Sequence, residues 1–392
     1  MKLKIHFALY ILFCLTFFSC QQKGEKQQAA TYHYSLQETD RILSYESKEP
    51  FGIRLFAVFP FTDKKGNRYL TFQDPFQNKI CIYEMFTGKH CKTLEIDREG
   101  PNGITRLLGY YIKDFDEIYL TNRNLPVIAR TDTTGHIFQR ISYEKTDDGT
   151  FLIPTFESDN HTPLVIIKDT FYVTQGPVRG KDPDTWPVSC YIDTLHKSVG
   201  ILPFNYPQIL TELRTVGIGA EFAYSRCFDG SHFVYSFYYE ESIRVTSPDH
   251  RDMQQIPVKS KYIKQIANPH EKGPSDMFLS VKRLCEVPFY ADLIYDPYRS
   301  VYYRIVYPET KMEEEEGGTY IEIWTTGRKR FSIIILDKDF NIIGETLFPD
   351  YTYYSHDMFV GEEGLYIRSN HFKNPSFNED KLMFTCFELK KE

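Results

Sequence analysis

The sequence lacks any apolar run long enough to cross a bilayer as a helix. Its one candidate, residues 5–18, covers 14 positions and is broken by His6 and Thr16, whereas a membrane-spanning helix needs about 20. GxSxG, HExxH and phosphate-loop motifs are missing, and no CxxC pair occurs. Sequence motifs therefore identify no catalytic residue, and we expect neither a cofactor nor a metal site.

Positive charge is also scarce. Lys and Arg number 46 against 53 Asp and Glu, which gives a formal net charge of −7. Basic residues form no stripe along the chain, and nucleic-acid-binding proteins carry such a stripe. This balance argues against a nucleic-acid partner and against binding of anionic lipid headgroups by the folded part.

The N-terminus has the pattern of a cleaved secretory signal. Lys2 and Lys4 precede the apolar stretch, no acidic residue interrupts it, and Ser19-Cys20 follows it. A small residue before such a cysteine resembles the lipobox of bacterial lipoproteins, although Phe17 stands where that motif usually has Leu. We expect cleavage before Cys20 and lipidation of its thiol and freed amine, because several acyl chains together anchor a protein stably.

This interpretation divides the chain into three parts. Residues 1–19 form the signal peptide, residues 20–30 form a flexible tether without large apolar groups, and residues 31–392 form a single domain. We expect the mature protein in the cell envelope, held by its lipid on the outer membrane and facing either the periplasm or the surface. The membrane is then a partner through the anchor alone.

Two of the remaining cysteines flank a predicted turn. Cys81 and Cys91 lie on either side of the turn Phe86-Thr87-Gly88-Lys89, and disulfides persist outside the cytoplasm. A hairpin could place the two thiols opposite each other as a disulfide. The alternative is that both are small apolar residues on strand faces.

A repeated unit dominates the rest of the chain. Each copy has a strand ending in aromatic residues, a polar loop, a β-branched strand, a short turn and a returning strand. The six copies begin at Tyr69, Ile118, Phe171, His232, Val301 and Leu365. A further strand precedes most copies, as at 55–59 and 289–294. The sixth copy is incomplete, and residues 32–36 can supply its missing strand.

This repeat predicts an all-β fold, a six-bladed β-propeller of four-stranded antiparallel blades. An N-terminal strand joining the C-terminal blade would close the ring and remove its exposed edges. We expect helices only at 207–215 and 275–284. The competing fold is a pair of β-sandwiches.

The chain also resembles a known family. A Gly-Pro turn at Glu99-Gly100-Pro101 recurs at Lys272-Gly273-Pro274, between the fourth and fifth units. Together with the lipoprotein start and the six units, these turns resemble the six-bladed β-propeller lipoproteins of Bacteroidota, several branches of which are known only as domains of unknown function. The resemblance implies a fold and a location but no reaction.

Long polar loops should gather on one face of such a ring, and long loops on a rigid scaffold often carry function. The ligand-binding candidates on these loops are Gln73, Asp74, Arg98, Glu99, Asn122, Arg123, Arg179, Lys181, Glu271, Lys272, His356 and Asp357. His356-Asp357 could be a general base with an orienting carboxylate. Neighbouring residues of an extended segment point to opposite sides, however, which argues against that pair.

Three functions remain open at this stage. The first is a non-enzymatic binding or scaffolding module that presents the long-loop face to a protein or glycan. The second is a carbohydrate-active hydrolase or lyase, which needs two carboxylates or a Tyr/His pair at the ring axis. The third is a structural partner of an outer-membrane complex, which predicts an exposed apolar patch beside the ring.

Overall fold

The computed structural model describes residues 32–47, 51, 53, 55–74, 77–154, 158–176, 185–207, 223–266 and 276–392. The predicted signal peptide, Cys20, the tether and nearly all of the helix predicted at 207–215 lie outside these ranges. None of the helices in the described ranges is long and apolar enough to span a membrane.

Strands make up most of the described chain, and each follows the local pattern of its residues. The second strand of a unit is buried on both sides, as in β19 (Val301–Tyr307), where every residue is buried. The fourth strand is largely exposed, as in β17 (Met253–Pro257). Apolar runs therefore lie toward the inside of the molecule and polar strands toward its outside.

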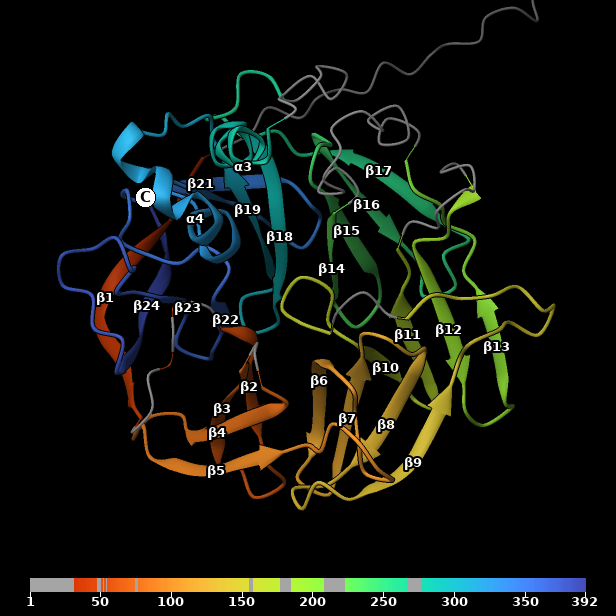
Figure 1. Ribbon diagram of the computed structural model, residues 1–392. Helices are drawn as coiled ribbons and strands as arrows, with labels where there is room; N and C mark the ends of the chain where they lie inside the picture. Colours follow the sequence, from red (N-terminus) through yellow and green to blue (C-terminus); the bar gives the residue numbers. More distant parts are fainter. Residues whose placement is uncertain are drawn as a thin grey trace, which may run out of the picture.

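Four sheets each contain four antiparallel strands that follow one another in the sequence (Figure 1). The first two sheets comprise β2 (Phe56–Thr62), β3 (Arg68–Asp74), β4 (Lys79–Glu84) and β5 (His90–Glu95), then β6 (Leu107–Asp114), β7 (Glu117–Asn122), β8 (Val127–Thr131) and β9 (Ile137–Ser142). The next two comprise β10 (Val165–Ile167), β11 (Thr170–Thr174), β12 (Ser189–Asp193) and β13 (Ser198–Ile201), then β14 (Tyr224–Phe228), β15 (Phe233–Phe237), β16 (Ser242–Thr246) and β17.

The remaining strands form one eight-stranded sheet in the order β18-β19-β20-β21-β1-β24-β23-β22. Its strands are β18 (Phe289–Asp296), β19, β20 (Ser332–Leu336), β21 (Ile342–Leu347), β1 (Tyr34–Glu46), β24 (Lys381–Lys391), β23 (Leu365–Arg368) and β22 (Met358–Val360). The fold is therefore propeller-like, with four four-stranded sheets and one of eight strands.

The prediction of six separate blades is thus corrected at one junction. β21 and β1 meet through a single parallel pair, Tyr34 with Gly344. A Cβ at Gly344 would lie 2.0 Å from the Tyr34 carbonyl oxygen, so only glycine allows this approach. Two groups of four strands that would otherwise be separate become one sheet there.

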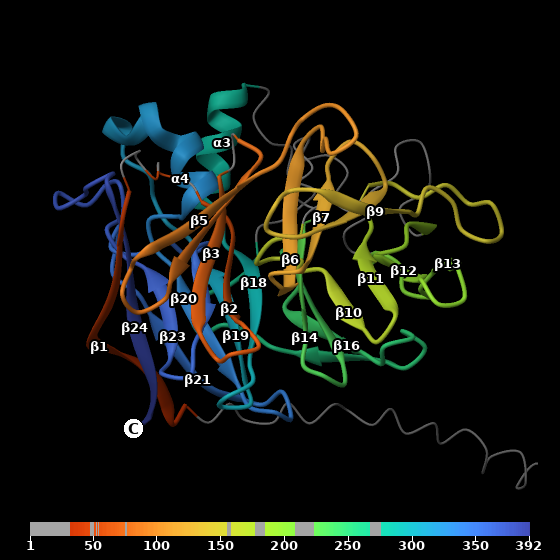
Figure 2. The ribbon, with the colours of Figure 1, turned by 90° about the horizontal axis from the view of Figure 1, so that it is seen from below.

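The predicted closure by an N-terminal strand is confirmed. β1 pairs antiparallel with β24 from Tyr34–Lys391 to Glu46–Lys381. Beyond the ladder, the amide of Glu392 donates to His33 O at 2.7 Å. The two ends of the described chain therefore lie together, on the side of the molecule opposite α3 (Met277–Glu286) and α4 (Tyr320–Thr326) (Figure 2).

Apolar cores lie between successive groups of four strands and return to the starting point. One cluster joins the first two sheets through Leu94 and Leu120, and others follow between each later pair. The last cluster packs Phe384 of β24 against Leu70 of β3. Two separate β-sandwiches would not share cores in this closed series.

In the described residues, two α-helices lie on one side of the molecule, next to the eight-stranded sheet (Figures 1 and 2). The helix predicted at 275–284 is confirmed as α3, whose first turn is capped by Asp276 accepting from Leu279 N at 2.9 Å. The 3-10 helix η3 (Glu314–Thr319) and α4 lie in the long insertion between β19 and β20, where we expected no helix.

A short segment, residues 158–162, runs through the centre of the ring and is called here the axial segment. Its backbone pairs with β6, where Ser158 N donates to Leu108 O at 3.0 Å. The side chain of Asn160 accepts from Val58 N of β2 and donates to Val58 O, both at 2.7 Å. His161 O accepts from Arg226 N of β14 at 2.7 Å.

Three innermost strands break their regular pairing where they meet the axial segment. The register shifts fall between Phe56 and Phe59 in β2, between Leu107 and Tyr110 in β6, and between Tyr290 and Leu293 in β18. Such bulges turn backbone groups and side chains away from the ladder. Here they aim Val58, Gly109 and Asp292 at the axial segment.

Gly109 is the tightest of these contacts and provides a test of the central packing. Its φ is +98°, and an added Cβ would lie 1.9 Å from Ser158 O. We expect Gly109→Ala to lower the free energy of unfolding by about 2–5 kcal/mol, from backbone strain plus overpacking. Urea unfolding measures this change.

Gly230 supplies the matched control, because it has the same φ of +98° but nothing within 4 Å of its added Cβ. Gly230→Ala should cost only the backbone strain, about 1–2 kcal/mol. Equal losses for the two variants would show that the contact between Gly109 and Ser158 contributes nothing.

Two buried histidines make the fold sensitive to acid. His250 donates from Nδ1 to Pro248 O at 3.1 Å, and His371 accepts from Lys373 N at Nδ1, also at 3.1 Å. Burial lowers the pKa of each to about 4. Both imidazoles are therefore neutral in the folded protein near neutral pH.

In the unfolded chain these imidazoles bind protons near pH 6.5, so folding stability should fall as pH drops from about 6.5 to about 4. The loss is on the order of 3 kcal/mol for each histidine. We expect His371→Gln to flatten the dependence of unfolding free energy on pH between 6.5 and 5. His136→Gln, in an exposed turn, controls for removing a histidine, and equal slopes for both variants would contradict the prediction.

Candidate functional site

A buried carboxylate lies at the centre of the ring. Asp292 stands in the bulge of β18, and its side chain is 1% exposed. Burial by itself would raise the pKa of Asp292, but the facing imidazoles of His161 and His356 outweigh that effect and lower the pKa to about 2. The group is therefore an anion held in the interior.

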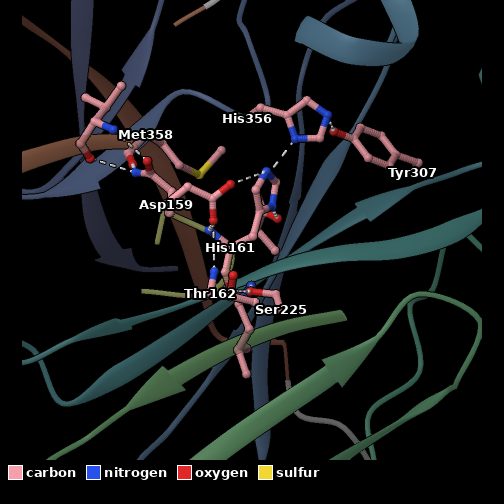
Figure 3. A network of polar contacts seen from close by, with 11 residues as sticks. Asp159, His161, Thr162, Ser225, Tyr307, His356 and Met358 are labelled. Carbon is pink, nitrogen blue, oxygen red and sulfur yellow. Dashed lines mark hydrogen bonds and ion pairs between the residues drawn. The ribbon is translucent and has the colours of Figure 1, made fainter. Parts of the chain in front are cut away.

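Two imidazoles face this carboxylate from different parts of the chain. His161, in the axial segment, contacts Asp292 Oδ1 through Nδ1. His356, just before β22, places Nδ1 at 3.7 Å from Asp292 Oδ2. The two rings lie side by side, with centroids 5.2 Å apart (Figure 3). Their side chains are 23% and 18% exposed, so solvent reaches the imidazoles but hardly the carboxylate.

A second layer of polar groups lies outside the two imidazoles. Nε2 of His356 lies 3.2 Å from the hydroxyl of Tyr307, which is visible beyond the ring in Figure 3. Nε2 of His161 lies 3.9 Å from Asp159 Oδ2. Asp159 is itself fixed, because its Oδ1 accepts from the amides of His161 and Thr162 at 2.9 and 3.0 Å.

We call His161, Asp292 and His356 the axial triad. One ligand atom from each residue lies within 4.8 Å of the other two. Imidazole nitrogen and carboxylate oxygen are common metal ligands, and an imidazole beside a carboxylate can also exchange a proton with a bound molecule. The arrangement therefore suits binding of a small polar group at the ring centre.

His356 is the one predicted site residue in the axial triad. Its predicted partner Asp357 points elsewhere and forms an ion pair with Arg368, Oδ2 to Nη1 at 2.8 Å. Arg368 also donates to Ile53 O at 2.9 Å. Asp357 thus helps to join β22 and β23 to the first sheet rather than orienting His356.

The other predicted residues are spread over the molecule. Gln73 is buried, donating to Leu107 O and accepting from Gly109 N, and Asn122 is buried and accepts from Asn124 N. The remaining described candidates lie at the rim, half-buried or exposed: Asp74, Arg98, Glu99 and Arg123. Arg179, Lys181, Glu271 and Lys272 lie outside the described residues.

The predicted disulfide is absent. The hairpin of β4 and β5 forms, but it pairs Cys81 with Thr93 rather than with Cys91. Neither cysteine forms a disulfide, and Cys91 is exposed. On the other side of the register shift between Ile82 and Tyr83, Tyr83 lies opposite His90. Neither register places Cys91 opposite Cys81, because the centre of the hairpin lies closer to Cys91 than to Cys81.

Asp292 and His161 were missed by the sequence reasoning. Asp292 stands in the apolar strand Phe-Tyr-Ala-Asp-Leu-Ile, and a charged residue inside such a strand is a signal of a special site. His161 had no comparable signal, because it follows no motif and lies 131 residues from Asp292. Only ring closure brings the two residues together.

Comparisons with known proteins agree with the fold and supply no reaction. No curated protein matches the chain significantly. A crystal structure of a DUF4221 family member from Bacteroides vulgatus is 26% identical, with a TM-score of 0.78 over 92% of this chain and all of that one. A Bacteroides fragilis structure called a "Putative exported protein" is 9% identical, with a TM-score of 0.51 over 91% of this chain and 96% of that one.

These comparisons support the part of the expected family resemblance that concerns the fold: the chain shares a propeller-like fold with a Bacteroides protein. Residues 34–347 match the family model described as Domain of unknown function (DUF4221). The chain therefore belongs to the DUF4221 family.

Proposed function

We propose that the protein is an envelope lipoprotein that binds a polar ligand at the ring centre through the axial triad. One observation carries this proposal: His161, Asp292 and His356 come from separate parts of the chain, yet converge at the ring centre, where two partly exposed imidazoles face a buried anion. Burying a charge is costly, and a binding role accounts for that cost.

The anchor fits this arrangement. β1 begins on the side opposite α3 and α4 (Figure 2), so a lipid on Cys20 would hold that side toward the membrane. The axial triad lies near the other side, because Arg328, two residues after α4, stacks over Tyr307 at 5.0 Å. We propose that the eight-stranded sheet acts as the fifth and sixth blades of a ring whose helical face is directed away from the bilayer.

An enzymatic role on carbohydrates is the second candidate, and the Tyr307–His356 contact at 3.2 Å favours it. Tyr307 is completely buried, however, so its hydroxyl cannot reach a sugar oxygen. Asp357, the carboxylate that follows His356 in the sequence, forms an ion pair with Arg368 instead. These contacts favour binding over hydrolysis or elimination.

The anchor is tested by substituting its cysteine. Cys20→Ser should release the protein from the membrane fraction and abolish incorporation of labelled palmitate, because the acyl chains have no attachment point. Cys14→Ser, in the apolar stretch of the signal, should leave both unchanged. Membrane retention and labelling of the Cys20→Ser variant would refute lipidation at this residue.

Ligand binding is tested by thermal unfolding with a panel of neutral and acidic oligosaccharides. A ligand that binds only the folded protein raises the unfolding midpoint, by an amount that grows with the logarithm of its concentration relative to its Kd. We expect at least one member of the panel to raise the unfolding midpoint of the native protein. Both His161→Ala and His356→Ala should reduce that rise, by an amount that corresponds to at least tenfold weaker ligand affinity.

His196→Ala is the control, because His196 also contacts a carboxylate, Asp193, at 2.7 Å, but on an exposed turn. It should keep the full shift. A shift that survives in both axial variants would place the ligand elsewhere, and the absence of any shift across the panel would contradict oligosaccharide binding. Turnover of a panel member would favour the enzyme instead.

A further inference from the structure

We propose that the axial triad binds a divalent transition-metal ion, with Zn²⁺ as the expected ion. The ligands would be Nδ1 of His161, Nδ1 of His356 and the carboxylate of Asp292. This inference rests on the proposed function, since it names the chemistry by which the same site takes its ligand.

The donor atoms suit a single ion. The ligand atoms of the three residues lie within 4.8 Å of one another, and ligands on one zinc ion, each bonded at about 2.0–2.2 Å, lie roughly 3–4 Å apart. Small side-chain movements therefore suffice. Three protein ligands also leave a fourth position free, as in zinc sites that bind an exchangeable ligand.

Two of these atoms have no other role in the described part of the chain. Asp292 Oδ2 and His356 Nδ1 are buried and make no hydrogen bond there, although they lie 3.7 Å apart. Unsatisfied buried polar atoms are rare in native proteins. A bound cation would satisfy both atoms at once.

The surroundings have the form of an outer ligand shell. Histidines that bind a metal usually direct their second nitrogen at a carboxylate or another polar group, which fixes the ring. His356 directs Nε2 at Tyr307, and the Nε2 of His161 lies nearest to Asp159. Both rings thus direct Nδ1 toward Asp292, while each Nε2 faces a polar group on the outside.

The donor set selects the class of ion. Two imidazoles and one carboxylate suit zinc and its neighbours in the transition series, whereas Ca²⁺ and Mg²⁺ prefer oxygen ligands in greater number. The two imidazoles are partly exposed, at 23% and 18%, whereas Asp292 Oδ2 and His356 Nδ1 are buried, so an ion would have to enter past the imidazole rings.

The test is equilibrium dialysis of the EDTA-treated full chain against Zn²⁺ alone, with metal content measured by mass spectrometry. We expect one ion per chain, and at least tenfold weaker binding in both His161→Ala and His356→Ala. Co²⁺ serves as a spectroscopic probe, whose visible absorption should report nitrogen and oxygen ligands. Ca²⁺ should not compete.

Control variants separate binding from folding. His232→Ala removes an exposed histidine 3.2 Å from Asp229 and should bind Zn²⁺ as the native chain does. Tyr307→Phe keeps all three ligands but removes the outer contact, so it should weaken binding about tenfold without changing the Co²⁺ spectrum. If Asp292→Asn does not fold, the two histidine variants still decide the matter.

The outcomes distinguish this inference from the proposed function. Native protein that takes up no Zn²⁺, or axial variants that bind it normally, would overturn the metal site. Stabilisation by an oligosaccharide that depends on His161 and His356 but persists in the presence of EDTA would exclude the metal site and leave the proposed function standing. If neither probe binds in a triad-dependent manner, both fail.

Discussion

The axial segment is the constraint on which the centre of this molecule depends. Blades of a ring present only their inner edges to the axis, and those edges leave backbone groups that need partners. Residues 158–162 supply the partners: Ser158 for β6, Asn160 for β2, and His161 for β14. The bulges of the inner strands and the orientation of the axial triad both follow from this one insertion.

Much of the fold could be predicted because patterns of neighbouring residues determine its strands and turns. Alternation, turn residues and repetition indicated the strands, and the spare N-terminal strand indicated the closure by β1 and β24. The merger of β21 with β1 could not be predicted, because it depends on one glycine, Gly344, meeting Tyr34. The insertion that contains α4 has no repeat to compare with.

The site could be predicted from the sequence far less well than the fold. His356 attracted notice because Asp357 follows it, but the geometry joins His356 to Asp292 and gives Asp357 to Arg368. A search for neighbouring motif residues fails when a site is assembled by ring closure, since its members are separated by long stretches of chain. An acid within an apolar strand, as at Asp292, is the more useful signal in this architecture.

The pairing of β1 with β24 has a mechanical consequence. A pull parallel to β1 on the chain before Tyr34 would load ten residue pairs of the ladder in shear together rather than one after another. The strand that closes the ring is thus also the strand that bears the load. A tethered molecule of this design would resist being opened by drag on its outer face, and its centre would keep its shape under tension.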